Sequence, residues 1–163
     1  MSLYQVAQGQ LQIVSPTTFL DEKVLERKDL QQLLKGDVSP LGDDLLVIAE
    51  EFGQWEDSKR RIDLLCLDKN RGLVVVELKR NEDGGHMDLQ AIRYAAMVSS
   101  MTFDQAVAAY SRFLGNGFSE PEASKKILEF LDTDSVEEAQ LTGDVRIILV
   151  AGDFSSELAT SVI

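Results

Sequence analysis

Two short apolar segments separated by a five-residue turn limit what this chain can fold into. The first runs from Arg61 to Leu67 and is rich in Leu, and the second runs from Leu73 to Lys79 and is rich in Val. The five residues between them, DKNRG, have the Asn, Asp and Gly typical of a tight turn. The pattern predicts a β-hairpin of buried strands. With its turn centred on Asn70, Leu67 lies opposite Leu73.

Three ionisable residues interrupt this apolar hairpin. Asp63 stands near the start of the first segment, and Glu77 and Lys79 stand near the end of the second. Ionised side chains are costly in a buried strand unless they are paired or bound to a metal ion. The register above brings Asp63 opposite Glu77 on one face of the sheet, and Lys79 shares that face because it lies two residues further on. Two carboxylates and one ammonium group are therefore expected at one end of the sheet.

This cluster suggests metal-dependent chemistry. Two carboxylates at such a separation repel each other unless a cation lies between them. Hard oxygen ligands favour Mg²⁺ or Mn²⁺, with water and substrate phosphate in the remaining positions, and the backbone carbonyl of Leu78 is a further candidate ligand. Lys79 would orient or activate a water molecule, or stabilise charge developing on phosphorus. The alternative reading of the spacing is a structural salt bridge between Lys79 and Asp63 or Glu77.

Periodicity and turn residues divide the rest of the chain into further elements. We expect a strand or hairpin over residues 3–14, helices over 21–35, 87–101, 102–114 and 121–131, strands over 44–51 and 146–151, and a last helix capped by Ser155. This order predicts an α/β fold with a central mixed sheet flanked by helices. We expect a single domain over residues 1–163, with a core of about residues 21–101 and 145–151, cut from a longer protein.

The pattern Asp63-x13-Glu77-Leu78-Lys79 resembles the motif of the PD-(D/E)XK nuclease superfamily, although Ile62 stands where the motif is named for proline. The resemblance implies a restriction-endonuclease-like fold and a divalent-metal nuclease site. In that site Asp63 and Glu77 bind Mg²⁺ or Mn²⁺, and Lys79 assists the attacking water.

A second motif follows on the next predicted helix. Gln90 and Tyr94 fit the Q-x-x-x-Y motif of the RecB-like branch, and their spacing of one helical turn puts them on one helix face. The closest resemblance is to the nuclease domain of the NucS-type endonucleases, which act on mismatched or branched DNA. It implies that Gln90 positions substrate or water, that Tyr94 contacts DNA or the hydrogen bonds of the site, and that Glu26 of the opening helix approaches the metal.

Basic residues flank the expected site. Arg61, Arg80 and Arg93 are candidates to contact phosphates of a DNA substrate. The chain as a whole is acidic, with 16 Lys and Arg against 28 Asp and Glu and a net charge of −12, which excludes a simple basic nucleic-acid coat. A locally positive site on an acidic body remains compatible with a nucleic-acid enzyme.

Other features bound the environment of the chain. The single cysteine, Cys66, excludes an internal disulfide and a multi-cysteine zinc site. No apolar run is long enough to span a bilayer, and the N-terminus lacks the pattern of a signal peptide. We therefore expect a cytoplasmic protein with no membrane partner.

Two functions other than a nuclease are compatible with the sequence. The first is a catalytically inactive nuclease-fold module that recognises nucleic acid or protein within a larger protein, which the acidic charge favours and the intact Asp63, Glu77 and Lys79 disfavour. The second is an acidic protein that mimics DNA, which predicts acidic residues spread over one face rather than gathered at a strand end. The expected partners are DNA, a second copy in a homodimer, and a domain beyond Ile163.

Overall fold

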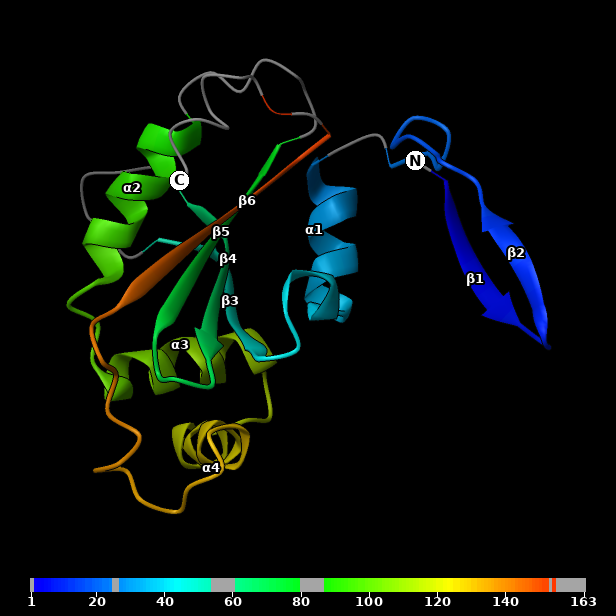
Figure 1. Cartoon of the computed structure of the whole chain (residues 1–163). Coiled ribbons are helices and arrows are strands. Elements are labelled where there is room, and N and C mark those ends of the chain that lie inside the picture. Colours follow the sequence, from blue (N-terminus) through cyan, green and yellow to red (C-terminus); the bar gives the residue numbers. More distant parts are fainter. Residues whose placement is uncertain (1, 25–26, 54–60, 80–86, 153, 155–163) are drawn as a thin grey trace.

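A computed structural model of the chain describes residues 2–24, 27–53, 61–79, 87–152 and 154. A four-stranded sheet lies at its centre, in the order β3-β4-β5-β6 (Figure 1). Neighbours β3, β4 and β5 are antiparallel, whereas β6 runs parallel to β5. The bounds are Leu45–Phe52 for β3, Ile62–Asp68 for β4, Leu73–Lys79 for β5 and Val145–Ala151 for β6. The predicted class, α/β with a mixed sheet, is confirmed.

The β4–β5 hairpin has the predicted register. Leu67 lies opposite Leu73, and the pairing continues to Leu64 opposite Val76. Asp68 organises the turn, because its Oδ1 accepts the backbone N–H groups of residues 70 and 72 at 2.8 and 2.9 Å. A carboxylate that accepts backbone amides in this way satisfies donors that the tight turn would otherwise leave without acceptors.

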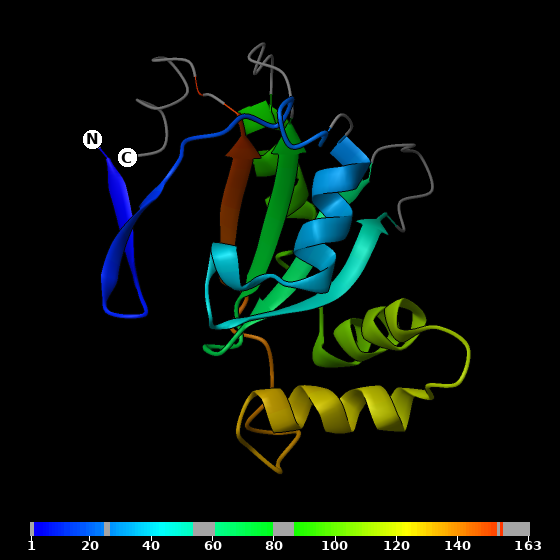
Figure 2. The same ribbon diagram turned by 90° about the vertical axis from the view of Figure 1, so that its right-hand side faces the viewer.

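Helices cover both faces of the sheet. Figure 2 shows α1 in front of the sheet and α2 behind it, while α3 and α4 lie side by side at one end. Their bounds are Arg27–Gly36 for α1, Met87–Val98 for α2, Phe103–Leu114 for α3 and Glu120–Phe130 for α4, with a short 3₁₀ helix, η1, at Ser39–Leu41. No helix in the described part of the chain has the length and apolar character needed to cross a membrane.

Alternate residues of the central strands enter two separate hydrophobic clusters. Leu65 and Val75 pack with residues of α2, α3 and α4, whereas Cys66 and Val74 pack with residues of α1 on the opposite face. Because both faces are covered, these strands are apolar along their whole length rather than at every second residue. The buried cluster extends past the expected core range, since Phe103 of α3 and Ile127 of α4 are part of it.

The first helix is shorter than predicted. Residues 19–23 form turns instead of the start of a helix over 21–35, and Lys23 has a left-handed φ of 59°. Thr18 Oγ1 donates a hydrogen bond to Asp21 Oδ2 at 2.8 Å and accepts one from the backbone N–H of Asp21 at 3.2 Å. Such local side-chain bonds compete with helical ones and favour a turn. The predicted cap at Ser155 lies outside the described residues.

A second hairpin precedes the main domain. Strands β1 (Leu3–Ala7) and β2 (Gln10–Val14) pair antiparallel, so the segment predicted as a strand or a hairpin is a hairpin, and it is separate from the four-stranded sheet. Gln8 and Gly9 form the turn with φ values of 51° and 76°. Two positive φ angles are those of a type I′ turn, whose twist suits a two-residue hairpin connection. Figure 1 shows this hairpin standing apart from the sheet and its helices.

Candidate active site

Two carboxylates are buried where β4 begins and β5 ends. Asp63 is 0% exposed and Glu77 is 3% exposed. Asp63 precedes Leu64 and Glu77 follows Val76 along their strands. Leu64 and Val76 lie opposite each other and belong to the hydrophobic cluster beneath α1. Because successive side chains of a strand alternate between faces, Asp63 and Glu77 both belong to the opposite face, beneath α2. The register on which the predicted cluster depends is therefore the one observed.

Asp63 joins the two strands through its side chain. Its Oδ2 accepts the backbone N–H of Leu78 at 2.7 Å. This short bond is charge-assisted when the carboxylate is ionised, and such bonds are stronger than those between neutral groups. Leu78 thus contributes its N–H to the site, and the role of its carbonyl oxygen as a metal ligand stays a prediction.

Glu77 is held from the helix side by the residues of the predicted Q-x-x-x-Y motif. Gln90 Nε2 donates to Glu77 Oε2 at 3.1 Å and lies 3.2 Å from the hydroxyl of Tyr94. Gln90 is half-buried and Tyr94 is 2% exposed. The helical spacing of four residues brings both side chains to one face of α2, which packs against β5 and β6. The motif therefore contacts the carboxylate that was predicted beside it.

The basic residues have different surroundings. Lys79 is half-buried as the last residue of β5, and alternation places it on the same face as Glu77. Arg61 is half-buried directly before β4, and Arg93 is exposed on α2. The candidates Glu26 and Arg80 lie outside the described residues. The described part of the site thus combines two carboxylates, one lysine and the Gln90–Tyr94 pair.

The donor set suits a hard divalent cation. The described residues contain no group of three or more His, Cys, Asp or Glu side chains arranged to hold a metal ion. Two carboxylates are enough for Mg²⁺, which is commonly bound through one or two of them and takes its other ligands from water and substrate phosphate. Asp63 and Glu77 come from adjacent strands at one end of the sheet and offer oxygen ligands. They are the residues that would hold Mg²⁺ or Mn²⁺.

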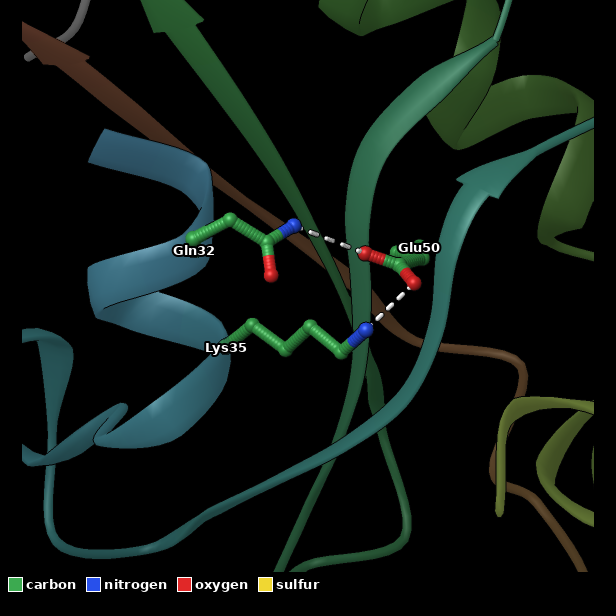
Figure 3. A network of polar contacts seen from close by, with 3 residues as sticks. All are labelled: Gln32, Lys35 and Glu50. Atoms are coloured by element: carbon green, nitrogen blue, oxygen red, sulfur yellow. Dashed lines mark hydrogen bonds and ion pairs between the residues drawn. The ribbon is translucent and has the colours of Figure 1, made fainter. Parts of the chain in front are cut away.

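A second polar cluster, which the sequence analysis missed, lies at the end of β3. Figure 3 shows two side chains of α1 pointing toward Glu50, with Gln32 Nε2 at 3.4 Å from its carboxylate and Lys35 in an ion pair with it. Lys35 Nζ also lies 5.3 Å from the centre of the Phe113 ring of α3. These contacts link α1 and α3 around the edge strand. The sequence feature that could have indicated this polar cluster is a pair of glutamates at the end of an apolar strand, residues 50 and 51.

A cavity of about 270 Å³ opens beside this cluster. Its polar lining comes from Glu50, Glu51 and Arg112. Phe52, also in its lining, pairs with Ile62, the residue before Asp63. The cavity therefore lies one strand away from the buried carboxylates, at the same end of the sheet.

Comparison of the chain with family models, with curated proteins and with solved structures finds no match. The function of the chain is therefore inferred from the residues of the site.

Proposed function

We propose that this chain is a divalent-metal-dependent nuclease of the PD-(D/E)XK type, with the restriction-endonuclease-like arrangement of its sheet, that hydrolyses phosphodiester bonds in DNA. The observation that carries the proposal is the burial of Asp63 and Glu77 on one face of adjacent strands. Burying two acidic groups is costly, and a site that binds a cation is a common reason for a fold to retain them. The resemblance of the motif supports the same conclusion.

Each described residue has a role that its position allows. Asp63 and Glu77 would bind Mg²⁺ or Mn²⁺, which when bound activates water and polarises the phosphoryl group. The Leu78 amide orients Asp63, and Gln90 orients Glu77, so the ligand geometry is fixed in advance. Lys79, on the same face, would orient the attacking water and stabilise negative charge developing on phosphorus.

The proposed substrate is DNA. The resemblance favours it, and Arg61, directly before β4, and the exposed Arg93 of α2 are the described cationic residues that we expect to contact phosphate oxygens. The net charge of −12 opposes general attraction to a polyanion. We therefore expect weak, salt-sensitive binding to unmodified duplex and selective action on a DNA structure that reaches the site.

The test is cleavage of single-stranded, duplex, flapped and mismatched DNA with and without Mn²⁺ or Mg²⁺. Asp63→Asn and Glu77→Gln should each lower the metal-dependent rate on the order of 10³-fold, since a bound metal ion supplies several kcal/mol of transition-state stabilisation. Glu50→Gln is the matched control, because it neutralises a carboxylate that pairs with Lys35 instead. Equal rates for all three variants would refute the assignment.

One observation favours a second candidate, a catalytically inactive module of the same fold. Asp63 accepts a backbone amide of the neighbouring strand, which is a structural role that needs no metal. Thermal melting separates the two candidates, because a ligand that binds only the folded state raises its stability. A metal-dependent rise in the melting temperature that Asp63→Asn abolishes supports the nuclease. Its absence, together with no cleavage of any DNA, supports the inactive module.

A further inference from the structure

The β1–β2 hairpin presents one face made only of apolar side chains. Tyr4 pairs with Ile13 and Val6 pairs with Leu11, so these four side chains lie on the same face. They are 54%, 59%, 76% and 72% exposed, respectively. The opposite face is mixed: Gln5 pairs with Gln12 at its centre, with their amides hydrogen-bonded at 3.3 Å, and Leu3 pairs with Val14 at one end. The hairpin is therefore amphipathic, and its apolar face has no cover within the described chain.

A hairpin of this kind is not expected to be stable alone. Two strands in isolation are marginally stable in water, and stability requires further strands or a packed face. Natural proteins protect exposed strands from association with lysine, proline or a bulge. Residues 3–14 contain neither lysine nor proline, and the pairing of β1 with β2 has no irregularity. The hairpin thus has the properties of a surface that meets a partner.

The charge distribution identifies the kind of partner. Residues 2–20 contain no charged side chain, whereas the whole chain has a net charge of −12. Two copies repel each other wherever their acidic bodies approach, but not at this hairpin. A nucleic acid or an anionic lipid surface requires Lys or Arg, which this segment lacks. A second copy of the same hairpin supplies a matching apolar face without like charges.

We propose that the face formed by Tyr4, Val6, Leu11 and Ile13 is a self-association surface, on which the hairpins of two copies of this chain pack face to face. Stacked sheets lie about 10 Å apart, which brings the two sets of apolar side chains into contact. The contact is isologous, with the same residues on both sides, as is usual for twofold-symmetric dimers.

The size of the face sets the expected strength of the dimer. Two five-residue strands span roughly 17 Å by 10 Å, since a strand rises about 3.4 Å per residue and neighbours lie about 4.8 Å apart. This is small beside the roughly 800 Å² that each partner of a stable complex buries. The dimer is therefore dissociable, and its population rises with protein concentration.

Sedimentation velocity of the full chain over a series of concentrations tests the proposal. The wild type should change from monomer to dimer as concentration rises. The double variant Val6→Lys with Leu11→Lys should stay monomeric, because association would bury four ammonium groups. The matched control is Gln5→Lys with Gln12→Lys, which sets the same two charges directly opposite each other on the other face. It should dimerise like the wild type.

A mixing experiment identifies the second hairpin as the partner. The variant Val6→Glu with Leu11→Glu should be monomeric alone, but an equimolar mixture with the lysine variant should sediment as a dimer, since opposite charges then face each other. A wild type that stays monomeric at every concentration overturns the proposal. So does a control that loses association as fully as the lysine variant, or a mixture that stays monomeric. None of these readouts depends on nuclease activity, so they leave the proposed function unaffected.

Discussion

The β4–β5 and β1–β2 hairpins have opposite properties. The β4–β5 hairpin is buried along almost its whole length, yet it contains Asp63 and Glu77 at its end. The β1–β2 hairpin has no ionisable group except Tyr4, yet its Leu, Val, Ile and Tyr side chains are exposed. Local sequence thus favours the strand pairing of both hairpins, while the burial of each depends on what else packs on it.

The difference in burial between the two hairpins shows that buried carboxylates require hydrogen-bond partners from the protein. A carboxylate at the surface can hydrogen-bond to water, whereas Asp63 and Glu77 accept from the Leu78 amide and from Gln90. Leu78 lies on the partner strand of the same hairpin, whereas Gln90 comes from α2, so the buried hairpin is held by a contact from a helix that the exposed one lacks. Substitutions should therefore have unequal effects in the two hairpins.

The largest difference is expected for one leucine in each hairpin. Leu65→Ala removes a fully buried side chain from the larger cluster and should lower the free energy of unfolding by about 2–5 kcal/mol. Leu11→Ala, at 72% exposure, should change it by less than about 0.5 kcal/mol in dilute solution. Urea denaturation measures both values. Similar losses for the two variants would show that the hairpins do not differ in burial.

The next effect concerns the bond between Asp63 and the Leu78 amide. Asp63→Ala leaves that N–H without its acceptor and should cost about 1–3 kcal/mol in free energy of unfolding. Asp63→Asn keeps an oxygen acceptor and relieves repulsion between the two carboxylates, so its cost should be smaller. Denaturation of both variants in the absence of metal checks this order. Equal costs would show that the amide bond does not contribute.

Alkaline pH should weaken the buried hairpin through Cys66. Burial raises the pKa of this thiol from about 9 to about 12, while Arg146 acts in the opposite direction. The Cys66 thiol loses its proton at lower pH in the unfolded chain than in the folded chain. Its ionisation therefore leaves the free energy of unfolding unchanged below pH 9 and lowers it as pH rises from 9 towards 12. The loss should be about 1 kcal/mol per pH unit. Unfolding at pH 8 and pH 10 measures it, and Cys66→Ala should lack this contribution.

Within the buried hairpin and the helix that packs on it, the smallest effect is expected at Tyr94. Tyr94→Phe removes the hydroxyl beside Gln90 but leaves the bond from Gln90 to Glu77 in place, so it should cost about 0.5 kcal/mol. Gln90→Ala removes the contact with Glu77 and should cost more. Denaturation of the two single variants gives the comparison. A larger effect of Tyr94→Phe would show that the hydroxyl, rather than Glu77, holds Gln90.

Much of the fold could be predicted because it is local. The register of Leu67 opposite Leu73 follows from the turn chemistry of the residues between them, and the hairpin at residues 3–14 follows from alternation around Gly9. The spacing of four positions from Gln90 to Tyr94 places both on one helix face whatever the rest of the chain does. These features depend on the geometry of strands and helices.

Contacts between distant segments could not be predicted in the same way. The ion pair of Lys35 with Glu50 joins a helix to an edge strand, and no short-range pattern marks its two members as partners. The start of α1 depends on bonds of Thr18 to its neighbours, which compete with helical bonds of similar strength.

By itself, the sequence determined the strand register, the helix faces and the position of the ionisable residues along the central hairpin, because these follow from fixed backbone periods. Only the tertiary structure decided that α2 brings Gln90 to Glu77, that Leu78 donates to Asp63, and that one hairpin is covered while the other is exposed. The physical reason is that burial and polar contacts depend on which distant segments pack together, and packing is a property of the whole chain.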